Sequence, residues 1–274
     1  MQPLSPIDLL KNMFVIYGKG FVKFIIPVII VEAILMAIMY GISFWTLYAN
    51  YNINDIGAFF VVTMLISIIY MIFNTLLVGF LYIIIASYKL TGKINLGNSL
   101  VLFRSRLLRL MGALGLLWLV SIGVSILGTL FLLIPIIGIV LVCLIGVPLM
   151  IYLLLRWIFV MHAVVIEGCG PGKAFTRSTN LIEDMWWSTF GMVLLLNVIP
   201  LAIACGLYYA FGLINPYLSV IGTILVTPLT AIGITLLYYD RRARSENVFV
   251  QDAVGELNPN YKKPERSDYS YPQT

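Results

Sequence analysis

Long runs of apolar residues, separated by short polar stretches, dominate the chain. The longest uncharged run lies between Arg109 and Arg156: residues 110–155, which is 46 positions, contain no Asp, Glu, Lys, Arg or His. About 20 apolar residues cross a bilayer core as a helix, so this run is long enough for two crossings. Pro135 and Gly138 lie near its middle, where they can form a tight turn. The run therefore predicts a transmembrane hairpin.

Two further regions have the same layout. No charged residue lies between Asp55 and Lys89 or between Asp184 and Asp240. The sequence therefore predicts an all-α integral membrane protein in which residues 1–242 form one polytopic membrane domain. Its six transmembrane helices, arranged as three hairpins, are expected at residues 22–45, 57–87, 110–132, 136–156, 186–212 and 217–239.

Each hairpin is preceded by a stretch with helical alternation of apolar and polar positions. In the second stretch the apolar positions step by four, three, four and three: Leu96, Leu100, Phe103, Leu107 and Leu110. The opposite face holds Asn98, Ser105, Arg106 and Arg109. This spacing predicts a separate amphipathic helix in the membrane interface, and stretches at residues 5–21 and 173–185 predict two more. The repeated unit is compatible with a parallel threefold internal repeat, or with convergent amphipathicity alone.

Composition and charge placement support a membrane protein with a defined orientation. Of 274 residues, 61% are hydrophobic and 11% are charged, whereas soluble domains carry about 25% charged residues. All 17 Lys and Arg fall within residues 11–23, 89–109, 156–177 and 241–266, and the intervening turns hold none. By the positive-inside rule, both termini are expected in the cytoplasm of a multi-pass protein of the cell membrane. The polar residues 243–274 predict a disordered cytoplasmic tail.

Three polar residues well inside the predicted spans are the candidate intramembrane site: Glu32, Asn74 and Asn197. An acid at the bilayer centre costs about 2.5–3.5 kcal/mol on translocon scales, so Glu32 needs a partner, a proton or water. One interpretation is a proton- or cation-handling site between helices. The other, favoured because no span offers a basic partner, is a hydrogen bond from Glu32 to Asn74 or Asn197 that holds the bundle together.

Basic residues on the amphipathic stretches are candidate contacts for anionic lipid headgroups. They are Lys11, Arg104, Arg106, Arg109, Lys173 and Arg177. The same charges would also be needed simply to set topology, and the two interpretations have equal weight. The glycines of the stretch Gly168–Gly172 do not form a phosphate loop, since no Gly-Lys-Ser/Thr follows, and we expect a flexible turn there.

Two motifs resemble a known prokaryotic family. They are Val164-Val165-Ile166-Glu167-Gly168 with Ala174-Phe175-Thr176-Arg177-Ser178, and Tyr238-Tyr239-Asp240-Arg241-Arg242-Ala243-Arg244. Over roughly residues 97–244 the chain is similar to the polytopic family labelled as the membrane domain of glycerophosphoryl diester phosphodiesterase, and to related archaeal and bacterial membrane proteins. The resemblance implies a stand-alone membrane module, because this sequence offers no His/Glu/Asp cluster for the phosphodiesterase metal site.

The residues offer little to catalysis. His162 is the one histidine, and Cys143, Cys169 and Cys205 show no disulfide or metal-site spacing. We therefore expect no enzyme, cofactor or nucleic-acid partner. The leading prediction is a scaffold or accessory subunit that contacts lipids, other membrane proteins or itself. The alternative is a channel or transporter for a small solute or lipid that uses Glu32 and proline-kinked spans, and a lipid-processing enzyme is a third, weaker prediction.

Overall fold

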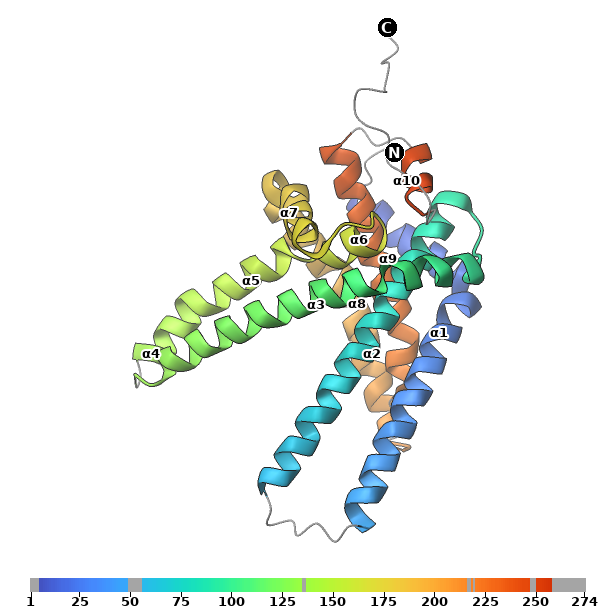
Figure 1. Cartoon of the computed structure of the whole chain (residues 1–274). Coiled ribbons are helices and arrows are strands. Elements are labelled where there is room, and N and C mark those ends of the chain that lie inside the picture. The colour runs from blue at the N-terminus through green and yellow to red at the C-terminus, as the bar shows by residue number, and fades with distance from the viewer. Residues whose placement is uncertain are drawn as a thin grey trace, which may run out of the picture. The chain divides into compact units, whose positions relative to one another are not determined.

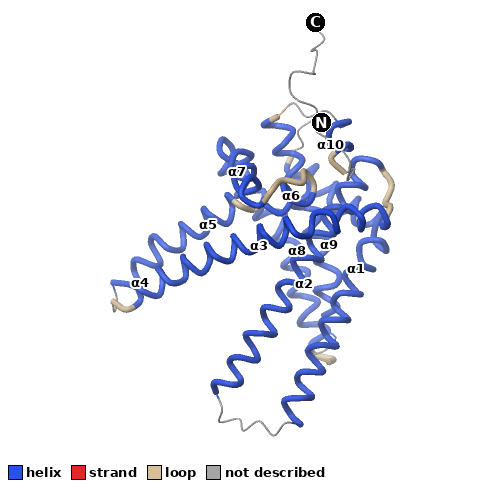
Figure 2. Tube along the Cα trace, viewed as in Figure 1, coloured by secondary structure: helices blue, strands red, loops and turns tan. Residues whose placement is uncertain are grey.

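The fold was analysed in a computed structural model, which describes residues 5–48, 56–134, 137–215, 218, 220–246 and 250–257. The described residues are helical or in short turns, and none of them forms a strand (Figure 2). The helices in chain order are α1 Pro6–Tyr48, α2 Ile56–Thr91, α3 Leu96–Leu132, α4 Ile137–Leu141, α5 Val147–Arg156, α6 Val160–Val165, α7 Pro171–Ile182, α8 Trp186–Gly212, α9 Val220–Ser245 and α10 Val250–Gly255 (Figure 1).

Within the described parts of the chain, six helical segments are long and apolar enough to cross a membrane, which confirms the all-α, six-span prediction. They are Pro6–Ile42, Phe60–Thr91, Leu96–Leu132, Ile137–Val165, Pro171–Gly212 and Val220–Ser245. An apolar chain satisfies its backbone hydrogen bonds within each segment when it is helical, which is what a bilayer requires. Helix α8 begins and ends where the sequence predicted the fifth span, at residues 186–212.

The prediction of three separate interfacial helices was wrong for the first two. Helix α1 runs without interruption from Pro6 to Tyr48, and α3 runs from Leu96 to Leu132. The stretches between the amphipathic and apolar parts hold no proline, and the glycines there can stay in a helix at a cost of about 1 kcal/mol each. Only α7 ends before its span, through a turn of 3₁₀-helix at Glu183–Met185. The three units are therefore not equivalent.

The second hairpin, formed by α3 with α4 and α5, turns where the sequence predicted, and Gly138 is required there. A Cβ on Gly138 would lie 1.8 Å from the carbonyl oxygen of Phe131, so no larger residue fits without moving the backbone. Pro135 lies outside the described residues. In the second helical arm of the hairpin, between α4 and α5, a π-helix at Val142–Gly146 precedes Pro148. The wider turn accommodates the missing N–H and the ring of the proline without ending the helix.

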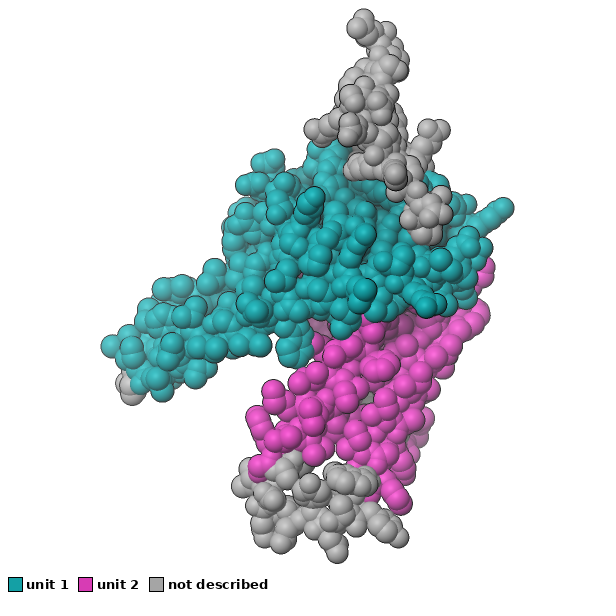
Figure 3. Space-filling model, in the orientation of Figure 1, with its two compact units in different colours: residues 1–4, 83–191, 238–274 teal, residues 5–82, 192–237 magenta. Residues whose placement is uncertain are grey.

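The chain forms two compact units, and each has its own core (Figure 3). Unit 2 comprises residues 5–82 and 192–237, with a core that includes Phe24, Val28 and Leu196. Unit 1 comprises residues 1–4, 83–191 and 238–274. In unit 1, α3 packs against α6 and α7, and α6 packs against α7.

The polar segment after α9 is partly folded, which corrects the tail predicted from residue 243. Helix α9 continues to Ser245, and α10 follows. Ala253 and Glu256 are buried. The remaining predicted tail, 258–274, lies outside the described residues. Sequence composition failed here because three of these polar side chains, Arg244, Glu246 and Glu256, form ion pairs in unit 1.

Candidate functional site

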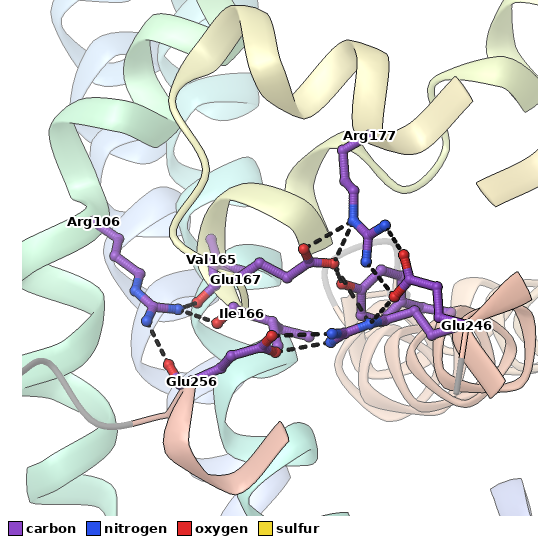
Figure 4. Close-up of polar contacts among 9 residues, drawn as sticks. Arg106, Val165, Ile166, Glu167, Arg177, Glu246 and Glu256 are labelled. Atoms are coloured by element: carbon purple, nitrogen blue, oxygen red, sulfur yellow. Dashed lines mark hydrogen bonds and ion pairs between the residues drawn. The ribbon is translucent and has the colours of Figure 1, made fainter. Parts of the chain in front are cut away.

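A network of charged side chains lies within unit 1 (Figure 4). Its carboxylates are Glu167, just after α6, Glu246, just after α9, and Glu256, just after α10. The loop that carries Glu167 turns at Gly168, whose φ of +71° is costly for other residues. The charged side chains meet here because residues 167–177 lie beside the end of α9 and the segment after α10, which are distant from them in sequence.

Arg177 of α7 joins two of the three carboxylates. Its Nε donates to Glu167 at 3.1 and 2.9 Å, and its Nη2 donates to Glu246 Oε2 at 2.8 Å. Its Nη1 also donates to Glu246 Oε1. Such two-point contacts suit the planar guanidinium, which offers donors in a fixed fork.

Arg242 of α9 holds the third carboxylate. Its Nη1 and Nη2 donate to the two oxygens of Glu256 at 2.8 and 3.0 Å. Its Nε lies 3.6 Å from Glu167 Oε1 and 3.7 Å from Glu246 Oε2. The Tyr238 hydroxyl donates to Glu167 Oε1. The Arg242 side chain is only 2% exposed, so these carboxylates replace the water that its charge has lost.

Arg106 of α3 is buried, contrary to its predicted place on the polar face of an amphipathic helix. Its Nη1 donates to the carbonyl oxygens of Val165, at 2.5 Å, and Ile166. Its Nη2 donates to the carbonyl oxygen of Glu256 at 2.5 Å. One guanidinium thus fixes both the end of α6 and the end of α10.

The Gly168–Gly172 loop is held in place rather than free, which corrects the flexible turn predicted there. Arg109 Nη1 donates to the Gly168 carbonyl oxygen at 2.7 Å. The same loop leads into α7, where the buried Ser178 ties α7 to the end of α5. The Ser178 hydroxyl donates to the Arg156 carbonyl at 2.8 Å and accepts from the Phe159 amide at 3.1 Å.

The second sequence motif, residues 238–244, also makes contacts that hold unit 1 together. Besides Tyr238 and Arg242, Arg241 is buried and donates through Nη2 to Ser188 Oγ at 3.1 Å. Arg244 donates through Nε to the buried Asp240 at 2.9 Å. The charged end of α9 is therefore a packing element, and its charges are balanced inside unit 1.

The predicted headgroup contacts divide into two groups. Arg106 and Arg177 are occupied by carbonyls and carboxylates, so the structure does not leave them to bind a lipid headgroup. Arg109 is exposed but donates to Gly168, and the exposed residues Lys11, Arg104 and Lys173 stay candidates. Sequence periodicity places residues on a face but does not reveal what that face meets. Two pairings lie close in the sequence: Glu167 with Arg177 within one motif, and Arg242 with Glu246 at i,i+4 spacing in the helical register.

A cavity in unit 2 contains the candidate intramembrane acid. It has a volume of about 680 Å³ and is lined by parts of α1, α2 and the start of α9. Glu32 is 3% exposed, and its Oε1 has no hydrogen-bond partner in the described part of the chain. Ser67 and Tyr70 of α2 also line the cavity. The site joins a buried carboxylate oxygen to mainly apolar walls.

The two asparagines do not bridge to this Glu32 oxygen as the sequence predicted. Asn74 is hydrogen-bonded to the Tyr70 side chain, and Tyr70 lies close enough to Glu32 for an electrostatic interaction. Asn197 Nδ2 donates at 2.7 Å to the Val193 carbonyl of its own helix. The structure thus brings Asn74 to the surroundings of Glu32 through Tyr70 and gives Asn197 a local role.

Comparisons of the chain with protein-family models, curated proteins and solved structures gave no match. The family resemblance rests on the sequence motifs and stays a hypothesis. In this chain three motif residues, Glu167, Arg177 and Arg242, belong to the ion-pair network of unit 1. Their contacts give them a structural role here.

Proposed function

We propose that this protein is a non-enzymatic multi-pass membrane module that acts as a scaffold or accessory subunit. The observation that carries the proposal is the closed network of unit 1. Each of its three carboxylates pairs with an arginine, and a third arginine, Arg106, donates to three backbone carbonyl oxygens. Charges that are paired in this way stabilise a fixed arrangement and are not poised for proton transfer or metal binding.

The hairpin of α3 and α4–α5 supplies the contact surface in this proposal. Its apolar side chains are largely unburied within unit 1: Leu119 is 68% exposed and Leu144 is 69% exposed. The hairpin extends away from the rest of unit 1 (Figure 3). Surfaces of this kind meet lipid or another membrane protein, because water is a poor solvent for them. A rigid base with an apolar arm suits a module that assembles with others.

Native mass spectrometry of the protein released gently from its own membranes tests this proposal. We expect a stoichiometric membrane protein partner. Leu144→Trp should reduce the amount of released complex, because the larger side chain disturbs a packed protein interface but not fluid lipid. Leu213→Trp, at an 89% exposed position outside the hairpin, is the matched control and should leave the complex intact. Release of the wild-type chain without any protein partner would refute the scaffold proposal.

The membrane and orientation form part of the proposal. Placement in the cell membrane with both termini in the cytoplasm is supported by the basic segments, whose charges favour the cytoplasmic side. Lys173→Cys, in a chain whose Cys143, Cys169 and Cys205 are replaced by serine, tests the orientation. A membrane-impermeant maleimide should label it in inside-out vesicles but not in intact cells. Labelling in intact cells would reverse the proposed topology.

A second candidate function, the channel or transporter of the sequence analysis, is supported by the cavity at Glu32. A partner-free carboxylate oxygen at the wall of a cavity is a feature that a scaffold does not need. It is also independent of the network in unit 1, because its lining residues all lie in unit 2.

A further inference from the structure

We infer that the cavity of unit 2 binds an amphiphilic organic amine, with the ammonium group at Glu32 and the apolar part along α1. The inference goes beyond the scaffold proposal, since it concerns the other compact unit. It rests on the depth of Glu32 in its membrane segment, on how the exposure of the lining residues changes along α1, and on the chemistry of the cavity walls.

Glu32 lies deep in its membrane segment. It is nine positions beyond Lys23 (32 − 23), which corresponds to about 14 Å along a helix axis. Half of a bilayer core is about 15 Å, so a Lys23 at the interface places Glu32 near the midplane. An ionised carboxylate at this depth is costly unless a cation or hydrogen-bond donor accompanies it. Since Oε1 has no such partner among the described residues, a bound cation would supply one.

The cavity is most deeply buried at Glu32, and the lining residues toward the end of α1 are more exposed. Glu32 and Leu35 are each 3% exposed, whereas Tyr40 and Phe44 are 67% and 59% exposed. All four residues line the cavity from α1. The spacing from Glu32 to Phe44 is 12 residues (44 − 32), or about 18 Å of helix. A ligand must therefore be elongated to fill it, with its charged end innermost.

The walls select against a bare metal ion and favour an organic cation. Besides Glu32, the lining is dominated by apolar groups such as Met36, Met39 and Phe44, with the Tyr70 ring beside the acid. Metal cations such as Ca²⁺ need six or more oxygen ligands around one point, commonly with several carboxylates, whereas Glu32 is the one carboxylate among the residues that line this cavity. Aromatic rings and a single carboxylate suit an ammonium group. The volume of about 680 Å³ is that of a pocket for a drug-sized molecule.

The test is binding of dansylcadaverine, an amine with an apolar fluorescent body, to the full-length protein in lipid nanodiscs. N-acetyl-dansylcadaverine is the matched uncharged probe. We expect the wild-type protein to bind the amine at least tenfold more tightly than the acetylated probe. Glu32→Gln, which keeps the side-chain volume and removes the charge, should abolish this preference. Equal affinity for the two probes in the wild type would overturn the inference and indicate an uncharged guest such as a lipid acyl chain.

Two variants locate the site and control for folding. Ser67→Phe fills the cavity while leaving Glu32 in place, and it should weaken binding of both probes at least tenfold. Asn197→Ala changes a polar residue of unit 2 that does not line the cavity, and it should bind both probes as the wild type does. Unchanged binding to correctly folded Ser67→Phe would overturn the inference, because the probes would then occupy another site.

A measurement on the wild type keeps the inference testable if a variant fails to fold. Dicyclohexylcarbodiimide is an apolar reagent that adds to buried carboxyl groups, and peptide mass spectrometry reports modification of Glu32. The reagent converts the carboxyl to an O-acylurea, and the primary amine of bound dansylcadaverine then attacks it and releases dicyclohexylurea. Glu32 should therefore be recovered as the dansylcadaverine amide, whereas the acetylated probe has no free amine and should leave only the carbodiimide adduct. Modification that is insensitive to the amine would overturn the inference. The scaffold proposal fails on a different result, the absence of a protein partner, so the two failures are distinguishable.

Discussion

Loss of the Glu256 carboxylate should unfold the end of the chain and destabilise unit 1. Glu256→Gln leaves the guanidinium of Arg242 buried, with its nearest remaining carboxylate oxygens 3.6 and 3.7 Å from Nε. Removing one partner of a buried pair costs about 3–5 kcal/mol. The two remaining carboxylates compensate in part, so we expect the lower end, about 3 kcal/mol.

Trypsin cleavage after Arg244 is a suitable assay, because this site lies at the end of α9, close to the network, and is present in every variant compared. When opening is fast relative to cleavage, the cleavage rate follows the population of the open form. A loss of about 3 kcal/mol then corresponds to roughly a 100-fold faster cleavage, since 1.4 kcal/mol is a factor of ten. Glu183→Gln, at an exposed position of the same unit, is the control and should change the rate by less than about threefold.

A double-mutant cycle separates the ion pair from other effects of the substitution. In Arg242→Met with Glu256→Gln, no uncompensated charge stays buried at this pair, so the double variant should be more stable than the Glu256→Gln variant. A cleavage rate for Glu256→Gln within threefold of the wild type would refute the reasoning. Strictly additive effects of the two substitutions would refute it as well.

Three further predictions concern positions in unit 1, each measured by unfolding in a denaturing detergent unless stated. Arg106→Lys should lower the free energy of unfolding by about 2 kcal/mol, because an ammonium cannot reproduce the fork that reaches three carbonyls, while Arg104→Lys at an exposed position should change little. Gly138→Ala should cost about 1–3 kcal/mol or more through its clash with the backbone, whereas Gly128→Ala, which has open space, should be neutral or stabilising. Ser178→Ala should cost about 1–3 kcal/mol and accelerate hydrogen exchange at the Phe159 amide, which donates to the Ser178 hydroxyl. Unchanged exchange would contradict the assigned bond.

The arginines of α3 illustrate where sequence reasoning stopped. Periodicity placed Arg106 opposite the apolar face of an amphipathic helix, yet Arg106 is buried and Arg104 is exposed. The helix was predicted correctly, but the face with Arg106 was expected to meet lipid headgroups and instead packs against the end of α6 and the segment after α10. Long basic side chains can be buried when their donors are satisfied, and the carbonyls that satisfy Arg106 lie 59 to 150 residues away in the sequence.

The sequence by itself determined the membrane class, the six apolar helices and the position of the turn between α3 and α4. These follow from local physics: the length of an uncharged run sets whether it can cross a bilayer, and proline and glycine limit where it can turn. It also identified Glu32 as an acid that needs an explanation. It did not determine that α10 folds, because this short polar segment shows no periodic apolar pattern and is held through the ion pair of Glu256 with Arg242.

Only the tertiary structure decided which charges are paired and which oxygen is left without a partner. One ion-pair network forms because residues 167–177 meet the end of α9 and the segment after α10. Each buried charge in it is stabilised by a partner that replaces its lost hydration, and its members are Glu167, Arg177, Arg242, Glu246 and Glu256. The partner-free oxygen of Glu32 depends in the same way on the packing around α1 and α2. Pairing of this kind is a property of three-dimensional neighbours, and a one-dimensional pattern does not contain it.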